Sequence, residues 1–229
     1  MYQSPSGRGA RGGPSAARPR SQECPYPDLP CRVPGQSQGR VIGWPNLVEK
    51  ANWLDGAASL DALRRGITNV ASRFCNMPSG ESRTRALQRW VRDHVRYTND
   101  YRVSQQSRGE EFADSESIIE RGYGDCDDKA RLYVALVRAA EGLVPLSTSA
   151  RIRPVFRAGG PHPIEFVHVQ AESRWWGSAS NPASLPGGWL LTELILAHCE
   201  IGQNPDELPR GPNGQRLIAG GHQNNTPGF

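Results

Sequence analysis

The chain has 229 residues and a net charge of +4 at neutral pH, from 27 basic and 23 acidic side chains. This length suits one hydrophobic core with tails, and the small charge excess does not by itself indicate nucleic-acid binding. Residues 189–199 are the best candidate for a membrane span, but Glu193 interrupts them, so membrane insertion is not expected. The first residues also lack the pattern of a secretory signal peptide.

The cysteines form an odd and irregularly spaced set. They are Cys24, Cys31, Cys75, Cys126 and Cys199. A disulfide framework needs paired cysteines, so this set favours reduced thiols and a cytoplasmic setting. Whether Cys24 and Cys31 pair with each other is left open by their spacing alone.

Three regions are distinguished by composition. Residues 1–45 are rich in Pro, Gly and Arg, with Glu23 and Asp28 as the only acids, and we expect a disordered or extended basic arm. Residues 46–202 carry the apolar patterns of a globular domain. Residues 203–229 are again rich in Gly, Pro and Asn, which predicts an irregular tail. Each end is either a solvated tail or a binding arm.

Three helices are predicted before the central motif. The first covers residues 59–76, and its apolar face consists of Leu60, Leu63, Ile67, Val70, Ala71 and Phe74. Pro78 and Ser79 then interrupt the chain and cap a second helix, whose apolar face consists of Leu87, Trp90, Val91 and Val95. His94 lies near this face and is interpreted as a half-buried structural histidine. A short third helix is capped by Asp114 or Ser115 and ends at Gly122.

The central motif is a glycine-containing loop that leads into a helix at Cys126. Gly122 and Gly124 allow a tight turn, and residues 126–140 contain neither Gly nor Pro and are apolar almost all round, which predicts a buried helix. A thiol at a helix N-terminus lies near unpaired N–H groups that favour its thiolate. Asp125, Asp127 and Asp128 oppose that ionisation. The alternative is an unreactive, buried cysteine.

Three strands are expected after this helix, over residues 151–157, 164–173 and 189–194. In the second strand, His168 alternates with the apolar Val167, Val169 and Ala171, so it belongs to the face that could meet the cysteine helix. A turn-rich connection favours antiparallel pairing of the last two strands. We expect this pairing to bring His168 and Glu193 side by side.

A cysteine at a helix start, a histidine on a strand and an acid on the next strand form a Cys/His/acid arrangement. The imidazole takes the thiol proton and the carboxylate orients the ring. On the stretches 90–97, 124–130, 167–169 and 188–193, the sequence resembles the transglutaminase-like superfamily, a branch of the papain-like thiol folds with short bacterial and phage-encoded members. The resemblance implies an α+β fold, with N-terminal helices and a buried cysteine helix packed on a small antiparallel sheet.

The same resemblance implies a thiol hydrolase or acyltransferase that acts on amide bonds of a protein or peptide through Cys126, His168 and Glu193, with no metal and no cofactor. The sequence departs from the family pattern at Glu193, where Asp is usual. His162 is the alternative base. Backbone N–H groups near Cys126 are expected to stabilise the oxyanion.

Two other functions follow from the same residues. The first is a structural subunit of a phage or phage-like particle, in which residues 1–45 and 203–229 dock on neighbouring subunits and the protein resides in the virion. The second is a metal site formed by His162, His168, His198 and Cys199. Adjacent His198 and Cys199 are poorly placed to share a metal with the others.

Overall fold

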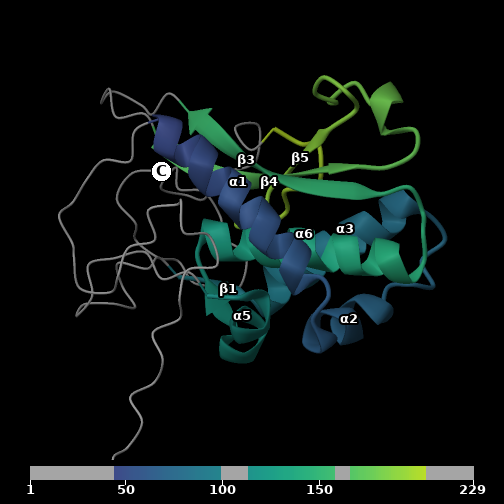
Figure 1. The fold of residues 1–229 in the computed structure, drawn as a ribbon. Coiled ribbons are helices and arrows are strands. Elements are labelled where there is room, and N and C mark those ends of the chain that lie inside the picture. Colours follow the sequence, from purple (N-terminus) through teal and green to yellow (C-terminus); the bar gives the residue numbers. More distant parts are fainter. Residues whose placement is uncertain (1–43, 99–112, 158–165, 205–229) are drawn as a thin grey trace, which may run out of the picture. The chain divides into compact units, whose positions relative to one another are not determined.

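The computed structural model describes residues 44–98, 113–157 and 166–204 (Figure 1). Cys24, Cys31, His162 and nearly all of the two predicted arms lie outside these residues. The elements in chain order are α1 (Trp44–Asp61), α2 (Arg65–Ser72), α3 (Gly80–His94), β1 (Arg96–Tyr97), α5 (Ser115–Arg121), β2 (Tyr123–Gly124), α6 (Cys126–Leu143), β3 (Ser149–Arg157), β4 (Phe166–Arg174), the 3-10 helix η1 (Ser178–Ser180) and β5 (Leu190–Thr192).

The fold is α+β, as the sequence predicts. Strands β3, β4 and β5 form an antiparallel sheet in that order, and β1 and β2 form a separate parallel pair. Helix α6 runs alongside β3 and β4, with α2 and α5 on its other side and α1 crossing it (Figure 1). No helix in the described ranges is both long enough and apolar enough for a bilayer crossing.

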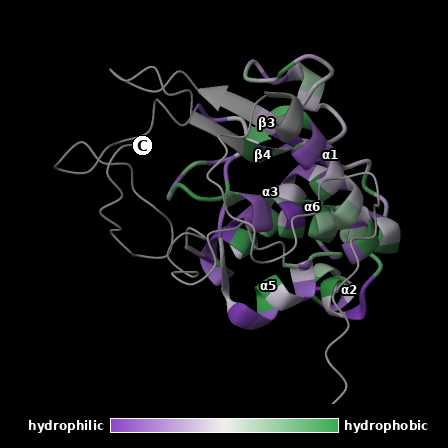
Figure 2. Ribbon diagram, turned by 60° about the vertical axis from the view of Figure 1, so that its left-hand side comes forward, coloured by the Kyte–Doolittle hydropathy of each residue, from purple (hydrophilic) through white to green (hydrophobic). Residues whose placement is uncertain are grey.

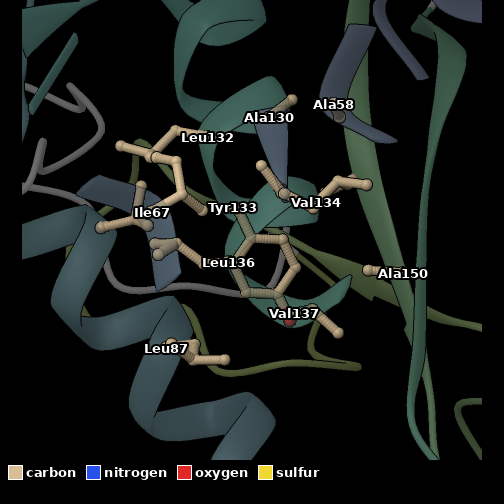
Figure 3. Close-up of a cluster of buried hydrophobic side chains, with 14 of the residues drawn as sticks. Ala58, Ile67, Leu87, Ala130, Leu132, Tyr133, Val134, Leu136, Val137 and Ala150 are labelled. Carbon is tan, nitrogen blue, oxygen red and sulfur yellow. The ribbon is translucent and has the colours of Figure 1, made fainter. Parts of the chain in front are cut away.

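Helix α6 lies at the centre of the hydrophobic core. Its side chains from Ala130 to Val137 are buried in an unbroken run. Figure 3 shows these side chains meeting Ile67 of α2, Leu87 of α3 and Ala150 of β3. In Figure 2 the ribbon of α6 is largely hydrophobic, whereas that of α3 is largely hydrophilic. A helix that is apolar almost all round is stable only when other elements cover every side of it, as they do here.

The helix ends follow the capping residues of the sequence. Ser79 accepts a hydrogen bond from the Ser82 N–H at 3.1 Å and completes a capping box at the start of α3. Asp114 caps α5 through the Ser117 N–H at 2.9 Å. Gly122 ends α5 with a φ of 68°, a backbone conformation that glycine adopts without steric cost. The predictions for both helices are confirmed.

The first predicted helix is wrong in one respect. Residues 59–76 do not form one helix, because α1 ends at Asp61 and α2 begins at Arg65. Leu60 and Leu63 are 53% and 82% exposed, whereas Ile67 at 0% lies in the core. Between the two helices Arg64 has an extended backbone, and the buried Asp61 carboxylate at the end of α1 binds Arg131 of α6. Helical periodicity alone does not reveal such a polar anchor.

Candidate active site

A short loop between α5 and α6 positions Cys126. The Arg96 N–H donates to the Gly122 carbonyl at 2.9 Å and the Thr98 N–H donates to the Gly124 carbonyl at 3.0 Å, so β1 and the residue after it hold this loop. A Cβ at Gly124 would lie 2.7 Å from the Asp128 Cβ, closer than any side chain tolerates. The glycine therefore permits the close approach that brings Cys126 to the first residue of α6.

The three aspartates around Cys126 have different partners. Asp125 caps α6, because its Oδ1 accepts the N–H groups of Asp127 and Asp128 at 2.9 and 3.1 Å. The Asp128 carboxylate pairs with Arg121 of α5. The Asp127 carboxylate pairs with Lys50, which comes from α1. Asp127 and Asp128 are thus each paired with a basic side chain, and Asp125 serves as the helix cap.

The Cys126 thiol itself contacts Asp127. Its Sγ lies 3.3 Å from Asp127 Oδ1, at hydrogen-bonding distance for a thiol donor. Burial raises the pKa of the Cys126 thiol well above its ordinary value, and the charges of Asp127 and Asp125 raise it further, whereas Lys50 lowers it. This direction is opposite to the lowering that a helix N-terminus alone predicts, because desolvation and two nearby carboxylates outweigh the dipole.

The backbone near Cys126 offers fewer oxyanion donors than the sequence suggests. The N–H groups of Asp127 and Asp128 are occupied by the Asp125 side chain. Among the described residues, the Cys126 N–H has no hydrogen-bond acceptor, as is usual at the first position of a helix. The Cys126 N–H is therefore the backbone donor beside the sulfur that is left to stabilise an oxyanion.

Glu193, the predicted acid, is buried just after β5 at 4% exposure. Its Oε2 accepts from Gln170 Nε2 at 2.7 Å and its Oε1 accepts from the Ile195 N–H at 2.8 Å. Gln88 of α3 donates to the Glu193 backbone carbonyl at 2.8 Å. Two hydrogen bonds to separate oxygens fix the orientation of the carboxylate.

His168 lies in β4, where its backbone pairs with Val155 of β3. Its side chain is outside what the structure describes. Ala171 pairs with Thr192, so the same antiparallel register carried one step further brings Gln170, rather than His168, opposite Glu193. The expected side-by-side arrangement is therefore shifted by two residues along β4. Val169 and Ala171 lie in the core, as predicted for that face.

Sequence reasoning did not anticipate the roles of Lys50, Lys129 and Gln170. Lys129 is fully buried, and its Nζ donates to the Val95 carbonyl at 2.5 Å. Burial lowers the pKa of Lys129 to about 8, and Glu193 opposes that shift. One signal was available, because Lys50 and Lys129 are the only lysines in the chain. A second was the position of Gln170, two residues beyond His168.

The remaining histidines and thiols of the described chain have structural surroundings. His94 is exposed rather than half-buried, and its ring stacks on Trp90 with a centroid distance of 4.5 Å. Cys75 and Cys199 are free thiols, and Cys199 is buried. In the described residues, one group of potential metal ligands lies close together, Asp125, Cys126 and Asp127. Its carboxylates already bind N–H groups and Lys50, which makes it a poor cation site.

Comparison with known proteins was made at three levels. Searches of curated proteins and of solved structures found no match. The family model described as the transglutaminase-like superfamily matches residues 68–143, from α2 to the end of α6. The matched segment contains Cys126 and ends before His168 and Glu193. Over residues 68–143, the chain is similar to the transglutaminase-like superfamily.

Proposed function

We propose that the protein is a thiol hydrolase or acyltransferase that cleaves or transfers amide bonds of a protein or peptide through Cys126, His168 and Glu193. The observation that carries the proposal is a half-buried thiol at the first residue of α6, beside a backbone N–H that has no acceptor among the described residues. A nucleophile and an oxyanion donor at one point are what acyl transfer requires.

The reaction begins with attack of the Cys126 sulfur on the amide carbonyl carbon. The thiol proton passes to the His168 imidazole, and the tetrahedral oxyanion accepts a hydrogen bond from the Cys126 N–H. The C–N bond then breaks, and the imidazolium gives its proton to the leaving amine. Water or a second amine attacks the thioester while the imidazole takes its proton. Breakage of the C–S bond regenerates the thiol.

The high pKa of the Cys126 thiol has a mechanistic consequence. A thiol beside Asp127 is protonated at neutral pH, so the sulfur loses its proton only as the substrate is attacked. The histidine then acts as a general base rather than as half of a standing thiolate–imidazolium pair.

Glu193 is proposed as the acid that orients the base. Its buried carboxylate has a fixed direction, because Gln170 and the Ile195 N–H each hold one oxygen. Residues two apart in a strand share a face of the sheet, so His168 and Gln170 are assigned to the same face. Gln170 is then the neighbour of His168 on that face of β4, and it binds the Glu193 carboxylate directly. The buried Oε1 of Gln170 lacks a hydrogen-bond donor among the described residues.

The proposal is tested by alkylation with iodoacetamide, with the modified cysteine identified by peptide mass. We expect Cys126 to react faster than Cys75, although Cys75 is also half-buried, and we expect His168→Gln to remove that advantage at neutral pH. His94→Gln is the matched control, because His94 is exposed and stacks only on Trp90. Cys126 that reacts no faster than Cys75 contradicts the proposal.

The alternative function, a structural subunit of a phage-like particle, depends on the terminal segments 1–45 and 203–229. Almost all of these residues lie outside the described ranges, so that function stays a prediction. Protease protection distinguishes it, since docking arms are protected in an assembly and accessible in the isolated chain.

A further inference from the structure

Helix α1 contributes a cation to the candidate active site although it lies outside the segment that matches the family. It covers residues 44–61, whereas the match begins at residue 68. Lys50 of α1 forms an ion pair with the Asp127 carboxylate, and the two side chains are only 13% and 9% exposed. An ion pair that is shielded from solvent is screened far less than one on the surface.

The same carboxylate reaches the candidate nucleophile with its other oxygen. Asp127 Oδ2 pairs with Lys50, while Oδ1 lies 3.3 Å from Cys126 Sγ. The charged groups that face the sulfur are therefore Asp127 from α6, Asp125 from the preceding loop and Lys50 from α1. Asp125 is held by the helix cap and Asp128 by Arg121, so Lys50 is the cation that offsets Asp127.

We propose that Lys50 is a positioning residue for Cys126, which holds Asp127 and offsets its charge so that the sulfur can lose its proton during attack. The inference rests on the proposed function, and it makes helix α1 part of the reactive site. Movement of α1 away from α6 would leave Asp127 unneutralised beside the thiol. A thiolate that forms next to an unpaired carboxylate is destabilised by like charge.

Helix α1 is well held in its position, which makes this contact a stable part of the site. Arg138 of α6 pairs with Asp55 at 2.8 Å, and the other oxygen of Asp55 accepts the Ile152 N–H of β3 at 2.8 Å. Substitution of Lys50 alone therefore changes the charge at the sulfur without releasing the helix.

The test measures the iodoacetamide rate of Cys126 as a function of pH in the full chain. We expect Lys50→Gln to shift the profile to higher pH and to slow alkylation at pH 7.5 by roughly 3- to 10-fold, the change that a pKa rise of up to about one unit produces. Lys50→Arg keeps the charge and should restore most of the rate. Asp127→Asn should instead speed alkylation, because it removes the nearest anion.

Three outcomes overturn the inference: a Lys50→Gln profile identical to the wild-type profile, a Lys50→Arg loss equal to that of Lys50→Gln, or slower alkylation in Asp127→Asn. Thermal unfolding of each variant shows whether it is folded.

The inference and the proposed function fail in different ways. The rate of Cys126 relative to Cys75, and its dependence on His168, test the proposed function. The ratio of the Cys126 alkylation rates in Lys50→Gln and Lys50→Arg tests the inference, because this ratio can be measured whenever Cys126 reacts with iodoacetamide.

Discussion

Gln170 and Glu193 form a buried, hydrogen-bonded pair, and the stability of the fold depends on residue 170 being uncharged. Gln170 Nε2 donates to Glu193 Oε2 at 2.7 Å, and the two residues are 5% and 4% exposed. We predict that Gln170→Glu destabilises the fold by more than about 2 kcal/mol at pH 8, because two buried carboxylates then face each other. The new carboxyl has a raised pKa in the folded state. Stability should therefore return as the pH falls and one acid becomes protonated.

Gln170→Leu is the matched control for that prediction. It removes one hydrogen bond to Glu193 and adds no charge, so its cost should be about 1–3 kcal/mol and nearly independent of pH. Urea denaturation of both variants at pH 5 and pH 8 separates the two effects. A Gln170→Glu deficit that is the same at both pH values would contradict the assignment of Glu193 as a buried carboxylate.

Lys129 gives a second pH-dependent prediction at the residue scale. Burial lowers its pKa to about 8 in the folded chain, against an ordinary value of 10.5. Between these values the unfolded chain holds a proton that the folded chain has lost, so the contribution of Lys129 to stability rises with pH. We expect the wild type to gain on the order of 3 kcal/mol at most over Lys129→Met from pH 8 to pH 10.5. Urea midpoints at both limits measure it, and a constant difference refutes it.

At the scale of elements, the loop between α5 and α6 is a place where glycine is required. Gly122 has a φ of 68° at the end of α5, and Gly142, near the end of α6, has no atom within 4 Å of where a Cβ would lie. We predict that Gly122→Ala costs about 1–2 kcal/mol of stability, because alanine is strained at positive φ. Gly142→Ala should gain about 0.5–1 kcal/mol, since alanine favours a helix interior. Chemical denaturation compares the two, and equal effects would exclude the backbone explanation.

The elements that the sequence predicted well are those with local signals. Helix α6 has a capping Asp125 and an apolar surface, and β3, β4 and β5 follow from their apolar and β-branched residues. The break between α1 and α2 was missed, because the apolar spacing of Leu60, Leu63 and Ile67 continues across it although Leu60 and Leu63 are exposed. Residues 44–58 of α1 were not assigned to a helix. The sequence located Cys126 at the start of a helix for the same local reasons. It did not predict that burial raises the pKa of the Cys126 thiol, nor that Lys50 from a distant segment opposes this shift.

At the scale of the whole described molecule, α6 contacts the other long helices and the strands β3 and β4. It binds α1 through Lys50, α5 through Arg121 and the sheet through the Tyr133 hydroxyl, which lies 2.7 Å from Ser173 Oγ. The family match covers part of α2 and all of α3, α5 and α6, but it includes neither α1 nor the sheet region with His168 and Glu193. Cys126, the proposed nucleophile, thus lies in the segment that matches the family model, whereas its proposed partners come from the sheet packed against that segment.

The buried Asp61 shows how this arrangement is held together, because its carboxylate joins three helices. At 1% exposure it accepts from Arg131 Nε of α6 at 2.7 Å and from Ser115 Oγ of α5 at 2.7 Å. We predict that Asp61→Ala lowers the free energy of unfolding by about 3–5 kcal/mol, because the Arg131 guanidinium then remains buried without its anion. Asp55→Ala breaks a partly exposed pair with Arg138 and a hydrogen bond from the Ile152 N–H, and should cost about 1–2 kcal/mol. Urea denaturation of both variants provides the comparison. Similar losses would mean that burial of the Asp61 pair adds nothing to the docking of α1.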